Sequence, residues 1–497
     1  MNMTITINQE KDKTVLTYPK AVMLSEVLRD AGLTHAHPCG GRGTCGKCAV
    51  RVQGSLSPMT ETERKGLSGA GYPTDGSVRL SCLCQAMGDI TIYYTTTNAP
   101  LQGLSAGFLR EFRKNPPLSD HAIGMAVDVG TTSVAAYLYD LSKGALLSQT
   151  CVENPQKAKG ADVISRILCA LQGGAEDLRT DISDCLTSLG ERLCQEAGVD
   201  LPTVMVVTGN TAMLSLATGT DVAPLSAAPF QIKRRFGEWV ESVYYPPCIS
   251  AYVGADMTAA ILASPMCEYP DKTALLLDVG TNGEMALWHK GQLTCCSTAA
   301  GPAFEGAGIS CGCLAIPGAV CRVEAKEGTL TYETIDHLPP VGLCGTGLID
   351  AAAALLKLGV LEDSGYMEED APIGASGLTL TRADIRQLQL AKAAIRAGID
   401  TLLLTAGIDY DSVQTVYLAG GFGSYLHPDT CGEIGMIPPE LISKIKVLGN
   451  AAGQGASLML LSSEELARGE EIARMAKTID LSSSAVFMEK YVDSMMF

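Results

Sequence analysis

The chain has 497 residues, which is more than one hydrophobic core accommodates, and so indicates several domains. Its formal net charge of −17 argues against a nucleic-acid partner, because neutralising phosphates requires a basic surface. A hydrophobic content of 46%, without an apolar run of about 18 residues, predicts a globular protein that does not span a membrane.

The chain starts with a polar segment instead of the apolar core of a secretion signal, which predicts a cytoplasmic location. In that compartment the 18 cysteines are expected to stay reduced or to bind metal, and not to form a disulfide scaffold. A thiol content of this kind suits an anaerobe.

Short alternating segments predict a β-rich first domain over residues 1–97. We expect a hairpin of strands at 3–7 and 14–17 and a short helix at 22–32. Three further strands are expected at 50–54, 78–82 and 89–94. This domain holds ten basic and eight acidic residues, so the acidic excess lies beyond it. Residues 98–121 lose the alternation and carry three prolines, which predicts a linker.

A glycine-rich loop, HPCGGRGTCGKC, carries Cys39, Cys45 and Cys48, and Cys82 follows after 33 intervening residues. Four thiolates suit iron–sulfur chemistry. Zinc also accepts four thiolates, but zinc sites favour two short Cys-x2-Cys pairs, and this chain offers one. The loop also fits the phosphate-loop pattern up to its lysine, but Cys48 stands where that motif needs a hydroxyl. Cys84 is the alternative fourth ligand, because it could face the same side of a strand as Cys82.

From residue 122 onward, apolar strands alternate with alanine-rich helices, which predicts α/β architecture. One motif occurs twice: AVDVGTTSVAAYLYD begins at Ala126, and LLDVGTNGEMALW begins at Leu276. Each copy places Asp-Val-Gly-Thr between two apolar strands. The repeat predicts a duplicated α/β domain with a first lobe at 122–270, a second lobe at 271–497 and a cleft between them.

The chemistry of the repeated turn favours a phosphate ligand. Glycine turns the chain tightly, and backbone N–H groups and a threonine hydroxyl can then hold a phosphate oxygen. The aspartate at the strand end can bind hydrated magnesium or orient an attacking water. A third segment, VYLAGGFGSYLHP at 416–428, ends a strand with a glycine pair that lets the backbone approach a flat ligand such as adenine.

In this order the three segments resemble the superfamily of acetate kinase, sugar kinases, Hsp70 and actin, whose fold is a duplicated ribonuclease H-like domain. The resemblance implies that Asp128 and Asp278 are catalytic. The ATP-binding residues that it implies are Gly130, Thr131, Thr132, Gly280, Thr281, Asn282, Gly420, Gly421 and Phe422. Glu284 and Glu305 are candidates for contacts to Mg²⁺ or water, and Asn210 is a candidate for the cleft wall.

The cysteine loop, taken with VRLSCLCQ, resembles the C-x5-C-x2-C…C loop of [2Fe–2S] ferredoxins, close to the adrenodoxin-type spacing. In that family the last ligand follows an apolar residue and a small one, which fits Leu80-Ser81-Cys82 better than Cys84. The resemblance implies a β-grasp ferredoxin-like fold with the cluster ligands Cys39, Cys45, Cys48 and Cys82.

Further stretches resemble reductive activators of corrinoid proteins, which join a ferredoxin-like domain to the ATP-binding fold: NPQ…GADVISRI, VVTGNTAM, YVGADMTA, AGPAFEGAGI, GLCGTGLID, QLAKAAIRAGI and LGNAAGQGA. The resemblance implies that ATP, Mg²⁺ and a [2Fe–2S] cluster serve to return Co(II) to Co(I) on the corrinoid protein of a methyltransferase system. An external low-potential reductant would supply the electron. Long members carry an additional domain between cluster and ATPase, and the linker of about 24 residues predicts a short form without it.

Other functions stay open at this point. The same fold serves small-molecule kinases, although phosphoryl transfer needs no iron–sulfur cluster. An ATP-driven electron donor to another low-potential enzyme, similar to the dehydratase activators, is a second alternative. A nucleotide-gated binding module without catalysis is a third. The sequence leaves open the corrinoid protein, the methyl donor, the ATP used per electron and the oligomeric state, including a homodimer.

Overall fold

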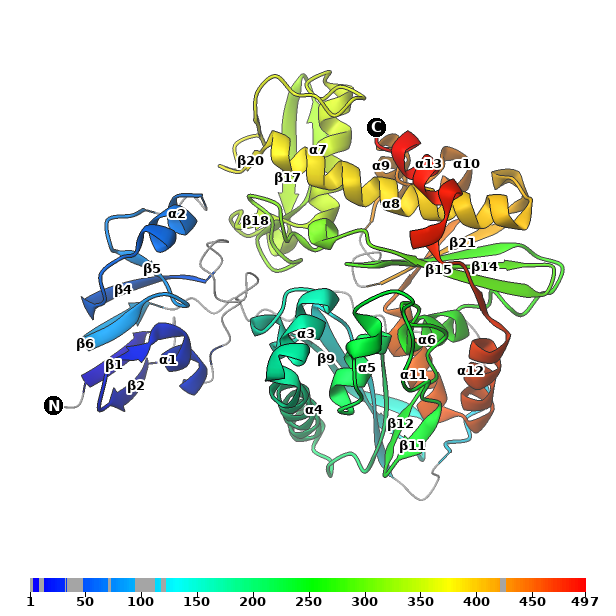
Figure 1. Ribbon diagram of the computed structural model, residues 1–497, viewed down its shortest axis with the longest axis horizontal. Coiled ribbons are helices and arrows are strands. Elements are labelled where there is room, and N and C mark those ends of the chain that lie inside the picture. Colours follow the sequence, from blue (N-terminus) through cyan, green and yellow to red (C-terminus); the bar gives the residue numbers. More distant parts are fainter. Residues whose placement is uncertain are drawn as a thin grey trace. The chain divides into compact units, whose positions relative to one another are not determined.

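The computed structural model describes residues 3–8, 13–31, 33, 48–69, 73–93, 112–117, 122–420 and 426–497 (Figure 1). Internal contacts divide the chain into two compact units, which we describe separately: residues 1–99 with 154–182, and residues 100–153 with 183–497. Each of the three large sheets lies inside one predicted domain or lobe, at 1–97, 122–270 or 271–497. The exact boundaries between these domains remain a prediction. Among the described residues, no helix has the length and apolarity needed to cross a membrane.

The N-terminal unit contains a mixed sheet of order β2-β1-β6-β4-β5, which is the predicted β-grasp fold. Its elements are β1 Met3–Asn8, β2 Lys13–Tyr18, β3 Val22–Met23, α1 Leu24–Asp30, β4 Ala49–Leu56, α2 Glu61–Gly69, β5 Val78–Leu80 and β6 Gln85–Tyr93. The hairpin of β1 and β2 is confirmed, and β1 runs parallel to β6. Alternation along the strands buries Ile5, Ile7 and Ile92 in one core with Val27 and Leu28 of α1.

The strand predicted over 78–82 ends earlier than expected. β5 stops at Leu80, and the chain then turns, because the amides of Leu83 and Cys84 both donate to the Leu80 carbonyl oxygen, at 3.0 and 2.9 Å. The expectation that Cys82 and Cys84 share one side of a strand is therefore wrong. Cys84 is completely buried in the core, whereas Cys82 is partly exposed.

A buried ion pair joins β5 to α2. Arg79 Nε and Nη2 each lie 2.9 Å from a carboxylate oxygen of Glu63, and the two side chains are 4% and 0% exposed. Glu63 also accepts from the Leu80 amide at 2.9 Å, and Arg79 Nη1 donates to the Ser57 carbonyl oxygen at 2.9 Å. Each guanidinium nitrogen has an acceptor, so the pair fixes the strand that precedes Cys82.

Glu63→Gln is expected to destabilise this domain by about 3 kcal/mol, because it leaves the Arg79 guanidinium buried without a counter-charge. The matched control is Glu61→Gln, which breaks an exposed pair with Lys65 at 3.9 Å and should cost less than about 1 kcal/mol. Urea denaturation of the full chain, followed through the visible absorption of an iron–sulfur cluster, measures both. Equal midpoints for the two variants would contradict a specific role of the pair.

The second unit contains two sheets of the same design, of order β11-β12-β10-β7-β8-β9 and β22-β21-β13-β14-β15-β23. In each, an antiparallel meander of three strands is extended by parallel strands beside its first strand. The strands are β7 Ile123–Val129, β8 Ser133–Asp140, β9 Ala145–Glu153, β10 Val204–Gly209, β11 Glu238–Val240, β12 Val243–Tyr245, β13 Ala274–Val279, β14 Gly283–His289, β15 Gln292–Thr298, β21 Thr415–Ala419, β22 Ile445–Gly449 and β23 Lys477–Thr478. The duplicated ribonuclease H-like fold is thereby confirmed.

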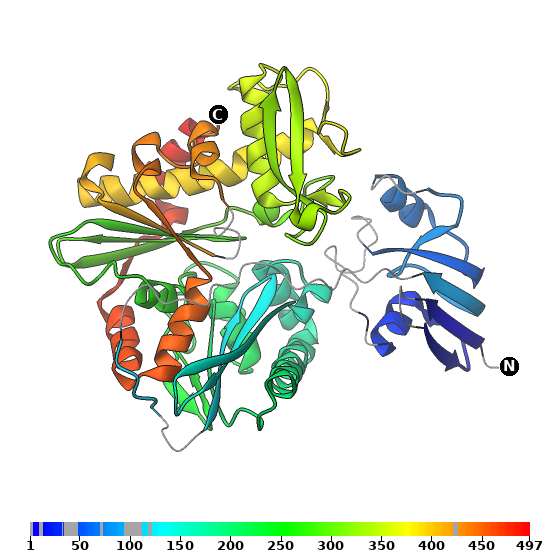
Figure 2. The ribbon, with the colours of Figure 1, turned by 180° about the vertical axis from the view of Figure 1, so that it is seen from behind.

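Two apolar helices, α6 Ala255–Ala263 and α11 Ala451–Leu461, pack against each other between the two sheets (Figures 1 and 2). Every residue of α11 is buried, as expected for a helix that is apolar all round. A Cβ atom on Gly455 would collide with the backbone of Ala259, so glycine lets the helices approach closely. Helix α8 Arg382–Ala406 covers the other face of the second sheet, on β14 and β15.

An insertion that the sequence did not predict separates β15 from α8. It contains a small sheet of order β17-β16-β18, helix α7 packed on β16, and a short hairpin. Its elements are β16 Ala319–Lys326, β17 Thr329–Thr334, β18 Gly342–Leu343, α7 Gly345–Lys357, β19 Ala371–Pro372 and β20 Thr379–Leu380. The remaining helices are α3 Val163–Cys169, α4 Ala175–Ala197, α5 Thr211–Ala217, α9 Pro428–Glu433, α10 Pro439–Ile442, α12 Ser463–Met475 and α13 Ala485–Asp493.

Candidate functional site

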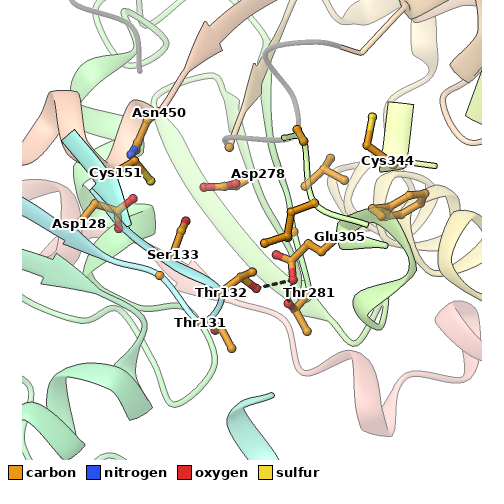
Figure 3. Close-up of a pocket in the computed structure, with 18 of the residues that line it drawn as sticks. Asp128, Thr131, Thr132, Ser133, Cys151, Asp278, Thr281, Glu305, Cys344 and Asn450 are labelled. Atoms are coloured by element: carbon orange, nitrogen blue, oxygen red, sulfur yellow. Dashed lines mark hydrogen bonds between the residues drawn. The ribbon is translucent and has the colours of Figure 1, made fainter. Parts of the chain in front are cut away.

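A cavity of about 400 Å³ lies in the second unit, at the ends of strands from both sheets (Figure 3). Asp128 is the second-last residue of β7, and Asp278 holds the same position in β13. The residues that bear on the argument come from both halves of the duplication: Asp128, Gly130, Thr131, Thr132, Cys151, Asn210, Asp256, Asp278, Gly280, Thr281, Asn282, Glu284, Glu305, Gly420 and Asn450.

The two Asp-Val-Gly-Thr turns face this one cavity, as the repeat predicted. Gly130 allows the first turn to close, because a Cβ atom there would lie 2.9 Å from the Ser133 carbonyl oxygen. Asn210 lines the cavity as expected, and its Nδ2 donates to Thr131 Oγ1 at 3.1 Å. Residues of both turns, including the threonines Thr131, Thr132 and Thr281, therefore line one space between the sheets.

Glu305 connects the two turns. Its Oε2 accepts a hydrogen bond from Thr132 Oγ1 at 2.5 Å and another from Thr281 Oγ1 at 2.7 Å. Figure 3 shows the carboxylate pointing between these threonines. One carboxylate oxygen is thus held by a donor from each half of the fold.

Six carboxylates line the cavity, from Asp128, Asp256, Asp278, Glu284, Glu305 and Asp336. Burial raises the pKa of Asp128 to about 7, and the charge of Asp278 adds to the effect. Burial also raises the pKa of Asp278 to about 6, with a contribution from Glu305, and that of Asp256 to about 8, with contributions from Asp128 and Asp278. The pKa of Glu284 is likewise raised, chiefly by burial. The cavity therefore concentrates acidic groups whose ionised forms a bound cation would stabilise.

The donor set suits Mg²⁺, which prefers carboxylate oxygens and keeps several water or phosphate ligands. Within the described residues, no three histidine, cysteine or acidic side chains are close enough to hold a metal ion. A magnesium ion at this site would thus take part of its coordination from water and from the phosphates of a nucleotide.

We expect the nucleotide-free protein to lose stability as pH rises from about 5 to 8. The folded-state pKa values of Asp278 (about 6), Asp128 (about 7) and Asp256 (about 8) exceed the usual value of 3.8. Between pH 3.8 and its folded-state pKa, each group holds a proton in the folded state that it lacks in the unfolded state. Each group therefore lowers the free energy of unfolding by up to ~1.4 kcal/mol per pH unit over that range. Calorimetry without and with Mg²⁺ and ATP measures the slope, which the ligands should flatten.

Asp256→Asn should reduce that slope, because the amide does not titrate. Asp140→Asn is the control: Asp140 lies at the opposite end of β8, and hydrogen bonds to Ser142 and Lys143 lower its pKa to about 2. A metal-free protein whose stability rises across this range would contradict the expected charge cluster.

The third predicted turn also reaches the cavity. Gly420 directly follows β21 and has φ at +94°, and a Cβ atom there would lie 2.6 Å from Asp278 Oδ1, so the position requires glycine. Gly421 and Phe422, the other predicted nucleoside contacts, lie outside the described residues. Their assignment stays a prediction.

Sequence reasoning did not single out several polar residues of the cavity wall, among them Asp256 and Asn450. Asp256 is the one acidic residue of the apolar helix α6, and this contrast was the available signal. Asn450 follows β22 and caps α11, where its side chain accepts from the Gly453 amide at 2.8 Å. An asparagine between a strand and a helix looks like an ordinary helix cap, and the family resemblance of LGNAAGQGA did not by itself assign Asn450 to the cavity wall.

The N-terminal unit places two of the predicted cluster ligands together. The Sγ atoms of Cys48 and Cys82 are 3.2 Å apart, and the Ser81 amide donates to the Cys48 carbonyl oxygen at 2.9 Å. Burial raises the pKa of the Cys84 thiol to about 11, which disfavours the thiolate that a metal needs. Cys39 and Cys45 lie outside the described residues.

Comparisons with known proteins agree with both domains. Three family models match: "2Fe-2S iron-sulfur cluster binding domain" at residues 5–87, "RACo middle region" at 123–269, and "C-terminal domain of RACo the ASKHA domain" at 272–497. The fold and these family models define an iron–sulfur protein with an ATPase domain of the actin and sugar kinase class. The match at 123–269 is the first lobe of that ATPase, not an additional domain in the linker.

The chain is 33% identical over 419 residues to the corrinoid activation enzyme RamQ of Eubacterium limosum, covering 75% of this chain and 70% of the relative. It is 29% identical to a [Co(II) methylated amine-specific corrinoid protein] reductase of Methanosarcina barkeri, covering 72% of both chains. A solved reductive activator for corrinoid, iron–sulfur protein matches with a TM-score of 0.70 and 28% identity, over 99% of this chain and 98% of that chain. The protein belongs to the family of reductive activators of corrinoid proteins.

Proposed function

We propose that this protein reductively activates a corrinoid protein in an ATP-dependent reaction. One electron passes from the reduced activator to cobalt, which changes from inactive Co(II) to Co(I), the state that accepts a methyl group. The observation that carries the proposal is the presence, in one chain, of an iron–sulfur domain and a two-lobed ATP cavity in a family of corrinoid activators.

The N-terminal domain would hold a [2Fe–2S] cluster through Cys39, Cys45, Cys48 and Cys82. The Cys48 and Cys82 sulfur atoms lie 3.2 Å apart, which supports both residues as ligands of the same cluster. When bound, the cluster accepts and releases one electron at a time. Cys84 would serve the hydrophobic core instead of the cluster.

The second unit would bind Mg²⁺ and ATP in its cavity. Asp128 and Asp278 are assigned as the catalytic carboxylates, because each is the second-last residue of the first strand of its lobe and both line the cavity. The phosphates would be held by Gly130, Thr131, Thr132, Gly280, Thr281 and Asn282, and the nucleoside by Gly420, Gly421 and Phe422. Asp256 and Glu284 would contribute charge around the Mg²⁺ ion.

ATP is needed because the reduction of Co(II) to Co(I) occurs at very low potential. Each 59 mV of deficit in a one-electron transfer lowers the equilibrium constant tenfold. ATP can offset such a deficit only if the nucleotide states of the protein differ in their affinity for the partner or its cobalt state. A cavity between two lobes provides two such states, one with the nucleotide bound to both lobes and one without it.

The proposed partner is the corrinoid protein of a methyltransferase system, and an external low-potential reductant would reload the activator. We place the reaction in the cytoplasm of an anaerobe, with neither nucleic acid nor membrane taking part. A homodimer is an arrangement that sedimentation analysis would test.

The test is anaerobic and spectroscopic. The reduced full-length protein is mixed with a Co(II) corrinoid protein, and the Co(I) absorption band is followed with and without Mg²⁺ and ATP. We expect a Co(I) band that depends on ATP. If ATP is hydrolysed but no corrinoid protein is reduced, an electron donor to a different low-potential enzyme becomes the better account. If nucleotide binds without hydrolysis or oxidation of the cluster, a binding module does.

A further inference from the structure

Glu305 lies where the nucleotide phosphates are proposed to bind. It ends the short helical turn Pro302–Glu305, between Gly301 and Gly306, whose φ angles are +80° and +73°. The same carboxylate oxygen accepts from Thr132 Oγ1 and Thr281 Oγ1, at 2.5 and 2.7 Å. An ideal Cβ atom on Gly280 would lie 3.7 Å from the other oxygen, so the whole carboxylate sits against the phosphate turns.

The two threonine hydroxyls cannot serve Glu305 and a phosphate at the same time as donors. A hydroxyl has one proton to donate, and here each proton is directed to the carboxylate. An anionic carboxylate oxygen and a phosphate oxygen form the same kind of charge-assisted hydrogen bond. They also repel each other, since both are negative. Glu305 and the phosphate therefore compete for one position.

We propose that Glu305 is a built-in competitor of the nucleotide phosphate. Its carboxylate holds Thr132 and Thr281 until Mg²⁺ and ATP displace it, and this exchange lowers the affinity for the nucleotide. The inference rests on the proposed function in one respect, namely that this cavity binds ATP. It assigns Glu305 a role opposed to that of a ligand for Mg²⁺ or water.

The turn that carries Glu305 is connected to the insertion. Farther along the same loop, the Cys313 amide donates to the Leu343 carbonyl oxygen at 3.0 Å, and the Leu343 amide donates to the Cys311 carbonyl oxygen at 2.7 Å. Leu343 belongs to β18 and comes two residues before α7. The Ser310 amide also donates to Asp384 in the first turn of α8, at 2.7 Å. Displacement of Glu305 would thus act on the insertion and on α8.

Isothermal titration calorimetry with a non-hydrolysable ATP analogue and Mg²⁺ tests the competition on the full-length protein without any corrinoid partner. Glu305→Ala should bind the analogue at least tenfold more tightly than the native protein. Glu305→Gln should lie between them, because the amide oxygen still accepts hydrogen bonds but carries no charge. The control Glu440→Ala removes an exposed glutamate of α10 and should change affinity less than twofold.

A double-mutant cycle separates competition for the hydroxyls from a general effect of charge. If Glu305 acts through Thr132 and Thr281, the gain from Glu305→Ala should fall below threefold in a Thr132→Val, Thr281→Val background. A full tenfold gain in that background would overturn the hydrogen-bond competition.

Hydrogen exchange provides a readout that does not depend on turnover. In the native protein the analogue should increase amide exchange in residues 300–315, whereas in Glu305→Ala this segment should exchange quickly before any nucleotide is added. An affinity that stays equal in Glu305→Ala would overturn the inference. An affinity that weakens would also overturn it and would make Glu305 a ligand of the nucleotide site. Failure of both proteins to bind the analogue would overturn the ATP site itself, and tight binding by the variant alone would support the competition.

Discussion

Asp278→Asn is expected to lower the rate of ATP-dependent Co(I) formation by about 10²- to 10³-fold, the range seen when one preorganised electrostatic group is removed from an active site. The amide has nearly the same size but cannot supply the negative charge that a Mg²⁺ ion requires. Asp128→Asn should have an effect of similar size, because Asp128 holds the equivalent position in the other sheet. Initial rates at saturating ATP, measured at the Co(I) absorption band, give the comparison.

Stability measurements distinguish this loss from misfolding. Burial raises the pKa of Asp278 to about 6, so its ionised form is unfavourable in the empty cavity at neutral pH. Asn at this position should therefore leave the thermal midpoint of the nucleotide-free protein unchanged or increase it. Asp140→Asn, at the far end of the first hairpin, is the matched control and should keep full activity. Normal activity in both Asp128→Asn and Asp278→Asn would remove these residues from the catalytic assignment.

Cys82→Ser is expected to abolish the [2Fe–2S] cluster, while Cys84→Ser should retain it. Cys82 Sγ lies 3.2 Å from Cys48 Sγ, whereas Cys84 is completely buried in the core of the β-grasp sheet. A serine hydroxyl at position 84 would replace a thiol in an apolar environment, at a cost of about 1–3 kcal/mol in folding free energy. Iron analysis and the electron paramagnetic resonance signal of the reduced protein report the cluster, and thermal denaturation reports the fold.

The two variants should therefore show opposite effects on iron content and on stability. Cys82→Ser should lose iron with little change of the β-grasp fold, and Cys84→Ser should keep iron in a less stable domain. Loss of the cluster from a well-folded Cys84→Ser, with full iron content in Cys82→Ser, would assign the fourth ligand to Cys84 instead. Cys267→Ser, in the second unit, is the control for removing a cysteine and should affect neither measurement.

The architecture was predictable where a pattern repeats or a local rule applies. The two copies of Asp-Val-Gly-Thr predicted both sheets and the convergence of Asp128 and Asp278 on one cavity. Alternating side chains predicted the β-grasp strands. The choice between Cys82 and Cys84 depended on a turn after Leu80, which the alternation of a strand does not reveal.

Other features depended on tertiary contacts. The insertion has strands as short as two residues in β18, which are too short for a periodic pattern. Asp256 and Asn450 are separated by almost 200 residues and meet only through the packing of α6 against α11. The bond between Glu305 and Thr132 joins the two lobes, so no local sequence rule predicts it.

The equivalence of the two sheets has an energetic consequence for electron transfer. A ligand that must touch a turn from each sheet binds well only when both turns are in place, so its free energy of binding becomes a bias toward that arrangement. At an ATP concentration 100 times the dissociation constant, this bias is about 2.7 kcal/mol. Expressed as a one-electron potential, the same free energy corresponds to roughly 120 mV. Where that arrangement is also the one that binds the Co(I) state of the partner better, nucleotide binding alone, before any hydrolysis, would shift an unfavourable reduction by at most about two powers of ten.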